Sequence, residues 1–412
     1  MAANDREQMM NYDEAQAIEA QNMLAVYTKI RQPMVMVRGE GAYVWDSEGN
    51  RYLDLVSGGR AVTALGHCPG AVVQAIREQA GRLLHMSNDF YTEPQMELAR
   101  LLAELCVCKR AFFCNSGAEA NEAAIKLARK HARINYGADK IEIVTMLGSF
   151  HGRTMATLAA TGQPKYHADF EPLVPGFKHV EFNNIAALAG AVNERTCAVM
   201  LEPVLGESGV YPASAEFMAA CREECDRRGA LLVLDEVQTG LGRTGKLFAY
   251  EHYGVRPDVI TLAKALGSGM PIGAMLATDE AARAFAPGDH ASSFGGGALA
   301  AAAALAGVRA IIAGGVVENA RQVGAHLLEG LRRLAAKHRL ITEVRGLGMM
   351  AAADLAQPVA AEVRAACLRR KVLIQAVGAS MLRLIPALIL TEKQADAGLA
   401  VLDEALGEAA SA

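Results

Sequence analysis

Short apolar runs alternate with helical stretches through the middle of the chain, from about residue 111 to residue 315. Runs such as Leu231–Asp235 (LLVLD) are apolar at successive positions, which is typical of strands buried on both faces. Helices are expected to begin near Ser116, Ser214 and Ala298. The pattern therefore predicts a mostly parallel sheet between helices, an α/β fold. The predicted strands are Ala111–Cys114, Ile141–Met146, Cys197–Glu202, Leu231–Asp235, Val259–Ala263 and Ile272–Ala277.

The two ends of the chain have a different pattern of hydrophobic and polar positions. About forty residues at the amino end read as an arm, and Tyr43–Leu55 reads as a β-hairpin with its turn at Ser47–Asn50. Beyond residue 315, a smaller α+β domain is expected. Its predicted elements are a long helix, the segment Glu343–Leu355, another helix, the strand-like Val372–Ala376, the run Met381–Leu388 and a last helix capped by Thr391.

These differences in pattern predict that the chain has three parts. Residues 1–60 form the arm and hairpin and join the small domain, residues 61–315 form the large domain, and residues 316–412 form the small one. The length of 412 residues, 52% of them hydrophobic, is ample for two or three domains. A net charge of -4 does not favour nucleic acid or an anionic membrane as a partner.

The scattered cysteines and the lack of a recognisable signal peptide predict a cytoplasmic protein with reduced thiols. The amino end lacks the basic and apolar regions of a signal peptide, and the apolar stretch Phe294–Val308 is too short to span a bilayer. Eight cysteines are scattered along the chain. Cys221 and Cys225 lie one helical turn apart, which could suit a metal, but no further ligand pair lies nearby and packing is expected instead.

The segment FFCNSGAEANEAAIKLARK is a strand, a tight turn and a helix. Ser116 and Glu119 have the spacing of a capping box, so the helix is expected to begin at Ser116. Gly117 lets the backbone approach a ligand closely, and the free N–H groups of the first turn attract anions. A capped helix that binds nothing is the plain alternative. The turn follows a buried strand, however, where such sheets tend to bind ligands.

Two charged residues end apolar strands. Asp235 needs a partner when ionised, which could be an arginine, a metal or a protonated ring nitrogen. Lys264 could be a snorkelling surface lysine, or a buried amine with a lowered pKa that forms a Schiff base. Pyridoxal 5'-phosphate has a phosphate, a ring nitrogen that needs an anion and an aldehyde that needs an amine, so this one cofactor explains Ser116, Asp235 and Lys264 together.

Five segments in order then resemble the class III (ω-amino) aminotransferases: NSGAEANEAAIKLAR, FHGRT, EPVLGESGV, LDEVQTGLGRTG and TLAKALGSGMPIGA. The resemblance extends from about Val44 to Leu390. It implies a fold-type I pyridoxal-phosphate enzyme, and a homodimer whose active sites lie at the subunit interface. Within the family, the chain is most similar to members that act on N2-acetylornithine.

The resemblance also implies roles around the cofactor. Lys264 would carry the cofactor as a Schiff base and move protons, and Asp235 would pair with the ring nitrogen. The other cofactor contacts would be Ser116, Gly117 and Ala118 on the phosphate, Phe150 stacked on the ring, Gln238 facing the phenolic oxygen, and Ser293 on the phosphate of the partner subunit's cofactor.

For the substrate, the resemblance implies that Arg153 clamps a carboxylate and that Ser292 lies nearby. An ordinary salt bridge is the alternative for Arg153. Glu207 and Arg383 would act as a switch: Glu207 neutralises Arg383 when the amino donor binds, and releases it to hold the second carboxylate of glutamate or 2-oxoglutarate. An ordinary ion pair is the plain alternative for these two residues.

Some positions depart from the family pattern. Gly297-Ala298 stands where Asn-Pro is usual, and Ser293 replaces a threonine. Arg60 stands where a small aliphatic residue is usual, which could mean a more acidic donor, a carrier-linked substrate or a salt bridge between subunits.

The expected reaction is transfer of the terminal amine of N2-acetylornithine to 2-oxoglutarate, in arginine biosynthesis. Ornithine, succinylornithine, 4-aminobutyrate and lysine-pathway compounds are alternative donors. A racemase or aminomutase of the same fold, and a non-catalytic scaffold, are the other two hypotheses.

Overall fold

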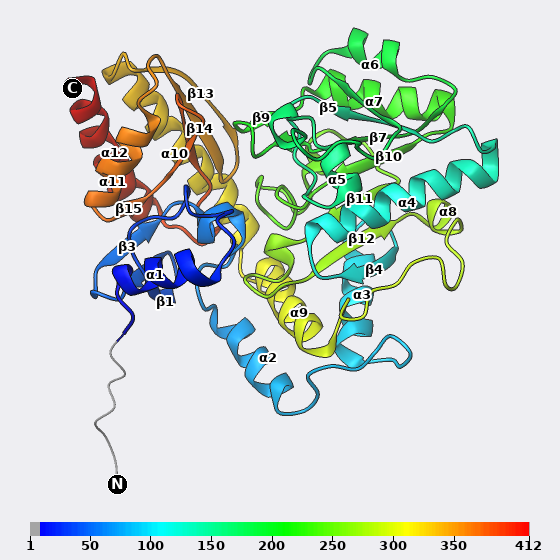
Figure 1. Cartoon of the computed structure of the whole chain (residues 1–412), viewed down its shortest axis with the longest axis horizontal. Helices are drawn as coiled ribbons and strands as arrows, with labels where there is room; N and C mark the ends of the chain where they lie inside the picture. Colours follow the sequence, from blue (N-terminus) through cyan, green and yellow to red (C-terminus); the bar gives the residue numbers. More distant parts are fainter. Residues whose placement is uncertain (1–8, 412) are drawn as a thin grey trace.

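A seven-stranded sheet forms the larger part of the molecule in this computed structural model, which describes residues 9–411. Its strand order is β4-β12-β11-β10-β7-β5-β6, and helices lie on both of its faces (Figure 1). The strands are β4 (Arg110–Cys114), β5 (Glu142–Met146), β6 (Phe177–Val180), β7 (Thr196–Leu201), β10 (Leu231–Asp235), β11 (Val259–Leu262) and β12 (Gly273–Ala277).

Both faces of this sheet are buried, as the continuous apolar runs predict. In β10, Leu231 and Val233 pack on one side against the helix α4 (Gly117–Tyr136). Leu232 and Leu234 pack on the other side, in the cluster that includes helix α7 (Ala215–Arg228). Cys221 and Cys225, the pair with metal-compatible spacing, are buried in that second cluster.

Strand direction places the functional residues at one edge of the sheet. Strands β6, β5, β7, β10 and β11 run parallel to one another, whereas β12 runs antiparallel to both β11 and β4. Reversal at β12 makes β4 point the same way as the parallel strands. The carboxyl ends of β4, β5, β7, β10 and β11 therefore meet along a single edge.

Two smaller sheets form the other lobe in Figure 1. One has the order β13-β14-β17-β16, and the other, β1-β2-β3-β15, joins the amino-terminal hairpin to a strand from the carboxyl-terminal part. The strands are β1 (Met36–Glu40), β2 (Tyr43–Asp46), β3 (Arg51–Asp54), β13 (Ile341–Leu347), β14 (Met350–Leu355), β15 (Val372–Leu373), β16 (Gln375–Val377) and β17 (Met381–Leu384); the helices are α10 (Val316–Lys337), α11 (Ala360–Arg369) and α12 (Glu392–Ser411).

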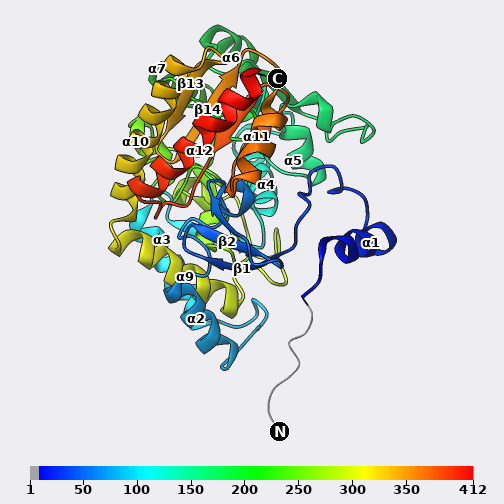
Figure 2. The ribbon, with the colours of Figure 1, turned by 90° about the vertical axis from the view of Figure 1, so that its left-hand side faces the viewer.

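Further helices lie around these sheets. Helix α9 (Ala298–Ala313) packs against α2 (Gly70–Ala80) and α3 (Glu93–Leu105). Helix α1 (Tyr12–Asn22) has no buried residue and stands off from the body of the molecule in Figure 2. The remaining short elements are α5 (Met155–Ala160), α6 (Ile185–Ala191), α8 (Asp279–Ala282), β8 (Val204–Leu205) and β9 (Tyr211–Pro212), with the single helical turns η1 (Ser57–Ala61), η2 (Pro164–Tyr166), η3 (Ala249–His252) and η4 (Lys264–Leu266).

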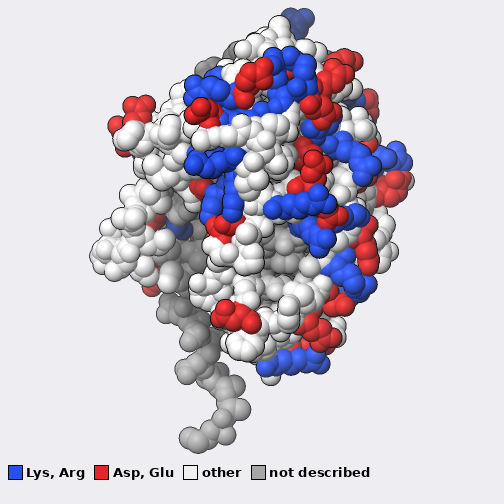
Figure 3. Space-filling view, turned by 90° about the vertical axis from the view of Figure 1, so that its right-hand side faces the viewer, with Lys and Arg blue, Asp and Glu red and all other residues white. Residues whose placement is uncertain are grey.

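Within residues 9–411, no single helix is long and apolar enough to cross a membrane. Helices α9 and α10 meet that length and composition only when taken together, across a bend of 65°. On the face seen in Figure 3, lysines and arginines are interspersed with aspartates and glutamates.

Most predicted elements are observed within one or two residues of their expected bounds, including the hairpin, the six strands and the helix after Thr391. Several elements were not predicted, among them strand β6 and helices α1, α2 and α3. The segment Val372–Ala376 is divided between two strands, β15 and β16, that belong to different sheets.

Candidate active site

A cavity of about 270 Å³ lies at the carboxyl edge of the large sheet. It brings together side chains from five strand ends that are far apart in the sequence. Its lining residues are Gly117, Ala118, Asn121, Phe150, His151, Gly152, Arg153, Glu202, Glu207, Asp235, Val237, Gln238, Ala263 and Lys264.

Helix α4 begins at this cavity. The Ser116 hydroxyl accepts a hydrogen bond from the N–H of Glu119 at 3.2 Å, so Ser116 caps the helix. The predicted capping box is incomplete, because the Glu119 carboxylate accepts a hydrogen bond from the N–H of Asn115, at 2.8 Å, and not from that of Ser116. Free N–H groups of the first turn and the positive end of the helix dipole therefore border the cavity. A Cβ on Gly117 would lie 2.8 Å from Cγ1 of Val237, so glycine is needed here for packing as well.

Asp235, at the end of β10, is buried and fully engaged. Its Oδ2 accepts hydrogen bonds from Asn121 Nδ2 at 2.7 Å and lies 2.8 Å from His151 Nδ1, and its Oδ1 accepts one from the N–H of Val237. Asn121 is fixed in turn, because its Oδ1 accepts a hydrogen bond from the hydroxyl of Thr261 at 2.7 Å. The carboxylate is thus held in one orientation at the floor of the cavity.

Lys264 follows β11 and lines the same cavity. Its φ of 34° is in the left-handed region, a strained conformation for a residue with a side chain and one that is common at functional sites. In the described part of the chain, its ammonium has no hydrogen-bond partner. Burial lowers the pKa of Lys264, although the nearby carboxylates of Glu207, Glu202 and Asp235 act in the opposite direction.

Glu202 is a buried acid that directly follows β7. Its two oxygens accept hydrogen bonds from the N–H of Phe150 at 2.9 Å and the N–H of Gly206 at 3.1 Å. Burial, and then the neighbouring charge of Asp235, raise the pKa of Glu202 to about 7. Glu202 therefore ties together the two loops that carry Phe150 and Glu207.

Arg153 extends over aromatic rings at the cavity. Its guanidinium carbon lies 4.0 Å from the ring centroid of Tyr166 and 5.6 Å from that of Phe150. It forms no ion pair with any residue that the structure describes, so the salt-bridge alternative has no partner among those residues. A stacked guanidinium keeps its hydrogen-bond donors available for a ligand.

Glu207 lies between β8 and β9 and contacts two arginines. Its Oε2 is 3.2 Å from Arg383 and 2.7 Å from Arg60, and its Oε1 accepts a hydrogen bond from Gln238 at 3.2 Å. Burial alone would raise the pKa of Glu207, but the charges of Arg383, Lys264 and Arg60 hold it at about 2. Arg60 therefore forms a salt bridge within its own chain, and the salt bridge between subunits stays a prediction.

Gln238 is buried beside Glu207. Its Oε1 has no hydrogen-bond partner among residues 9–411. An unsatisfied buried amide oxygen at a cavity wall is available to a ligand that can donate a proton.

Ser292 and Ser293 do not line the cavity of their own chain. The Ser292 hydroxyl contacts Asn115 Nδ2 at 3.2 Å and accepts a hydrogen bond from the N–H of Gly295, and Ser293 is exposed. Their expected roles involve a second subunit, and these roles remain predictions.

Six lining residues were not predicted, and three of them have polar side chains: Asn121, His151 and Glu202. Glu202 carries the same signal as Asp235, an acid directly after an apolar strand, and could have been found that way. His151 lies within the FHGRT segment, but nothing in the sequence shows its contact with Asp235. In the described structure, no group of three or more His, Cys, Asp or Glu side chains could hold a metal ion.

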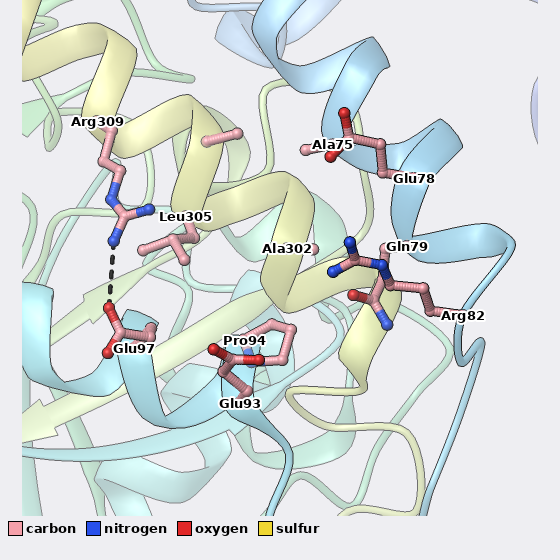
Figure 4. Close-up of a pocket in the computed structure, with 11 residues that line it drawn as sticks. Ala75, Glu78, Gln79, Arg82, Glu93, Pro94, Glu97, Ala302, Leu305 and Arg309 are labelled. Atoms are coloured by element: carbon pink, nitrogen blue, oxygen red, sulfur yellow. Dashed lines mark hydrogen bonds and ion pairs between the residues drawn. The ribbon is translucent and has the colours of Figure 1, made fainter.

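A second cavity, of about 340 Å³, lies between α2, α3 and α9 (Figure 4). Arg309 on α9 contacts Glu97 on α3 across it at 3.2 Å, while Glu78 extends from α2 and Arg82 from the turn that follows α2. None of the predicted site residues lines it.

Comparisons with known proteins indicate the family of this chain. The family model described as aminotransferase class-III matches residues 26–406. An acetylornithine aminotransferase from Caldanaerobacter subterraneus subsp. tengcongensis is 50% identical over 378 residues, 92% of this chain and 96% of that protein. A succinylornithine transaminase from Salmonella paratyphi A is 43% identical over 380 residues, 92% of both proteins.

Among solved structures, the ornithine aminotransferase from Toxoplasma gondii ME49 superimposes with a TM-score of 0.93 at 29% identity, over 98% of this chain and 97% of that one. The match of the family model over most of the chain, the identity to these relatives and the shared fold lead to one assignment. This chain belongs to the class III aminotransferases.

Proposed function

We propose that the protein transfers the terminal amine of N2-acetylornithine to 2-oxoglutarate, with pyridoxal 5'-phosphate as its cofactor. The observation that carries the proposal is that Lys264, Asp235 and the start of α4 line one cavity, with Arg153 on its wall. The high identity to acetylornithine aminotransferases supports this choice of donor.

The residues of the cavity fit this cofactor. The start of α4 offers N–H groups for the phosphate, Asp235 offers a fixed anion for the ring nitrogen, and Lys264 offers an amine. Gln238 lines the cavity with an amide that would face the phenolic oxygen of the cofactor, and Phe150 supplies an aromatic ring that would stack on the cofactor ring. When bound, pyridoxal phosphate carries the amino group between the two substrates and its ring absorbs the electron pair released at the substrate carbon.

Lys264 supplies the acid-base chemistry. Its Nζ takes the proton from the amine-bearing carbon of the donor. In the second half of the reaction, it delivers a proton to the carbon of the acceptor that receives the amine. A pKa lowered by burial leaves a larger fraction of the amine neutral and able to accept that proton. Asp235 acts as a fixed negative charge, oriented by His151 and Asn121, that favours a protonated ring nitrogen.

Two arginines provide for the carboxylates of the substrates. Arg153 has no ion-pair partner among the described residues and binds the carboxylate common to donor and acceptor. Arg383 is paired with Glu207 and becomes available to the second carboxylate of 2-oxoglutarate when that pair opens. One site thereby accepts in turn a donor with one carboxylate and an uncharged acetamide, and an acceptor with two carboxylates.

The active form is proposed to be a homodimer. Large apolar side chains are exposed around Ser292 and Ser293 and on the segment between α2 and α3, namely Leu84, Phe90, Tyr91 and Phe294. Tyr91 is 91% exposed. Surfaces of this kind are usually covered by a partner. In a dimer of this chain, Ser292 and Ser293 of each subunit would lie towards the cavity of the other subunit.

The proposal is tested with a panel of amino donors and 15N-labelled amine, with glutamate formation from 2-oxoglutarate as the readout. N2-acetylornithine is expected to give the highest kcat/KM, above N2-succinylornithine, ornithine and 4-aminobutyrate. A higher value for another donor would correct the substrate. Racemisation or amine migration without labelled glutamate would contradict the aminotransferase reaction itself.

A further inference from the structure

Arg60 adds a second guanidinium to a carboxylate that already has one. Both Arg60 and Arg383 contact the same oxygen of Glu207, at 2.7 Å and 3.2 Å. The two arginines differ in burial: the side chain of Arg383 is 2% exposed and that of Arg60 is 56% exposed. Glu207 therefore has one partner on the inner side and one on the outer side.

The loop that carries Arg60 is held in an unusual conformation. Four residues of η1 have positive φ, including Ser57 and the non-glycine Ala61 at 60°. Asp54 accepts hydrogen bonds from the N–H groups of Val56 and Gly58, which fixes one side of the turn.

Gln375 links this loop to Arg383. Its amide nitrogen donates to the carbonyl of Gly59, and its Oε1 accepts a hydrogen bond from Nε of Arg383 at 2.8 Å. Arg60 and Arg383 are thus positioned relative to one another through a single side chain, independently of Glu207.

The free-energy cost of opening the Glu207–Arg383 ion pair differs with and without Arg60. A largely buried carboxylate that loses its only guanidinium is left as an uncompensated charge, which is strongly unfavourable. With Arg60 in place, Glu207 keeps one ion-pair partner when Arg383 turns to a ligand. The carboxylate can also follow Arg60 towards solvent, because Arg60 lies on the outer side.

We propose that Arg60 is a specificity-determining residue for the acceptor: it holds Glu207 while a dicarboxylate occupies Arg383, and so favours dicarboxylate over monocarboxylate ligands. This inference rests on the proposed function, because it assigns 2-oxoglutarate to Arg383. Arg60 acts through Glu207 and is a positioning residue that need not contact the substrate.

Binding of two unreactive ligands to the holoenzyme, measured by calorimetry, tests the inference. Glutarate is a dicarboxylate, and pentanoate has the same length with one carboxylate. In Arg60→Met, the Kd for glutarate is expected to rise about tenfold, while the Kd for pentanoate changes by less than about twofold. Arg321→Met is the matched control, because Arg321 is also exposed and pairs with a glutamate, Glu318, far from the cavity.

A double-mutant cycle separates this role from direct contact with the ligand. In a Glu207→Gln background there is no carboxylate to hold, so adding Arg60→Met should leave the glutarate Kd unchanged. A tenfold loss that persists in that background would mean that Arg60 binds the ligand itself, and would overturn the inference.

Equal losses of affinity for glutarate and pentanoate in Arg60→Met would also overturn the inference. So would an unmodified enzyme that shows no preference for glutarate. These outcomes are distinct from a failure of the proposed function, in which the unmodified enzyme forms no glutamate from 2-oxoglutarate with any donor.

Discussion

Buried charges at the cavity depend on one another at the scale of single residues. Asp235 is oriented by Asn121 and His151, and its charge in turn contributes to the raised pKa of Glu202. The sequence pointed to Asp235 because an acid at the end of an apolar strand stands out. It could not point to Asn121, because the hydrogen bond joins residues 114 positions apart in the chain.

Glu202 gives the first prediction. Burial raises its pKa from 4.5 to about 7, so the folded state binds this proton more tightly than the unfolded chain. The resulting stability is present below pH 4.5 and is lost as pH rises through 7. In cofactor-free protein, Glu202→Gln should therefore gain up to about 3 kcal/mol in the free energy of unfolding relative to wild type between pH 5 and 8.

Urea denaturation at several pH values measures this difference. Glu216→Gln, at an exposed position of α7, is the control and should follow the wild-type curve. A Glu202→Gln curve parallel to that of wild type would show that Glu202 does not retain its proton in the folded protein.

Arg153 gives the second prediction. Loss of a charge-assisted bidentate contact costs about 1.5–3 kcal/mol, so Arg153→Ala should raise the donor KM about 10- to 100-fold. Bound cofactor, followed by its visible absorbance, should be retained. Lys165→Ala removes another cation from the same Tyr166 ring, 4.9 Å from its centroid, and should leave KM unchanged. Equal KM changes in the two variants would assign the effect to the ring instead.

At the scale of elements, strand ends and a helix start form the site. The start of α4 was predicted because the spacing of Ser116 and Glu119 is a local signal, and the observed helix begins one residue after Ser116. Helix α2 was missed because it buries only Val72, which gives a weak apolar period. Helix α3 buries Leu98 and Leu102 at helical spacing, a signal that the sequence did contain.

Contact between α4 and the segment after β10 gives the third prediction. Gly117→Ala places a methyl group against Val237, and we expect about 1–3 kcal/mol of destabilisation together with weaker cofactor binding. Val237→Ala should relieve much of this loss in the double variant. Thermal unfolding and cofactor titration measure both effects. Additive losses in the double variant would show that the two side chains do not meet.

At the scale of the whole molecule, the predicted division near residue 315 agrees in outline with the two lobes of Figure 1 but stays a prediction. The sheet β1-β2-β3-β15 pairs strands from opposite ends of the chain. Pairing over such a distance could not be deduced from local periodicity.

The proposed dimer gives the fourth prediction. Light scattering should give twice the 43.7 kDa mass of one chain. Tyr91→Asp places a charge on a side chain that is 91% exposed in one chain, and should shift the mass towards that of the monomer and reduce amine transfer. Met155→Asp, at an exposed apolar residue elsewhere, is the control. A monomeric wild-type protein with full activity would contradict a shared active site.

The central claim is that Lys264, Asp235 and the start of α4 hold one cofactor. Borohydride reduction of the enzyme incubated with pyridoxal phosphate, followed by peptide mass spectrometry, tests it most directly. The account predicts a single phosphopyridoxyl group, on the peptide containing Lys264, and none in Lys264→Ala. A stoichiometric label on another lysine, or no label on an enzyme that still transfers amines, would contradict it.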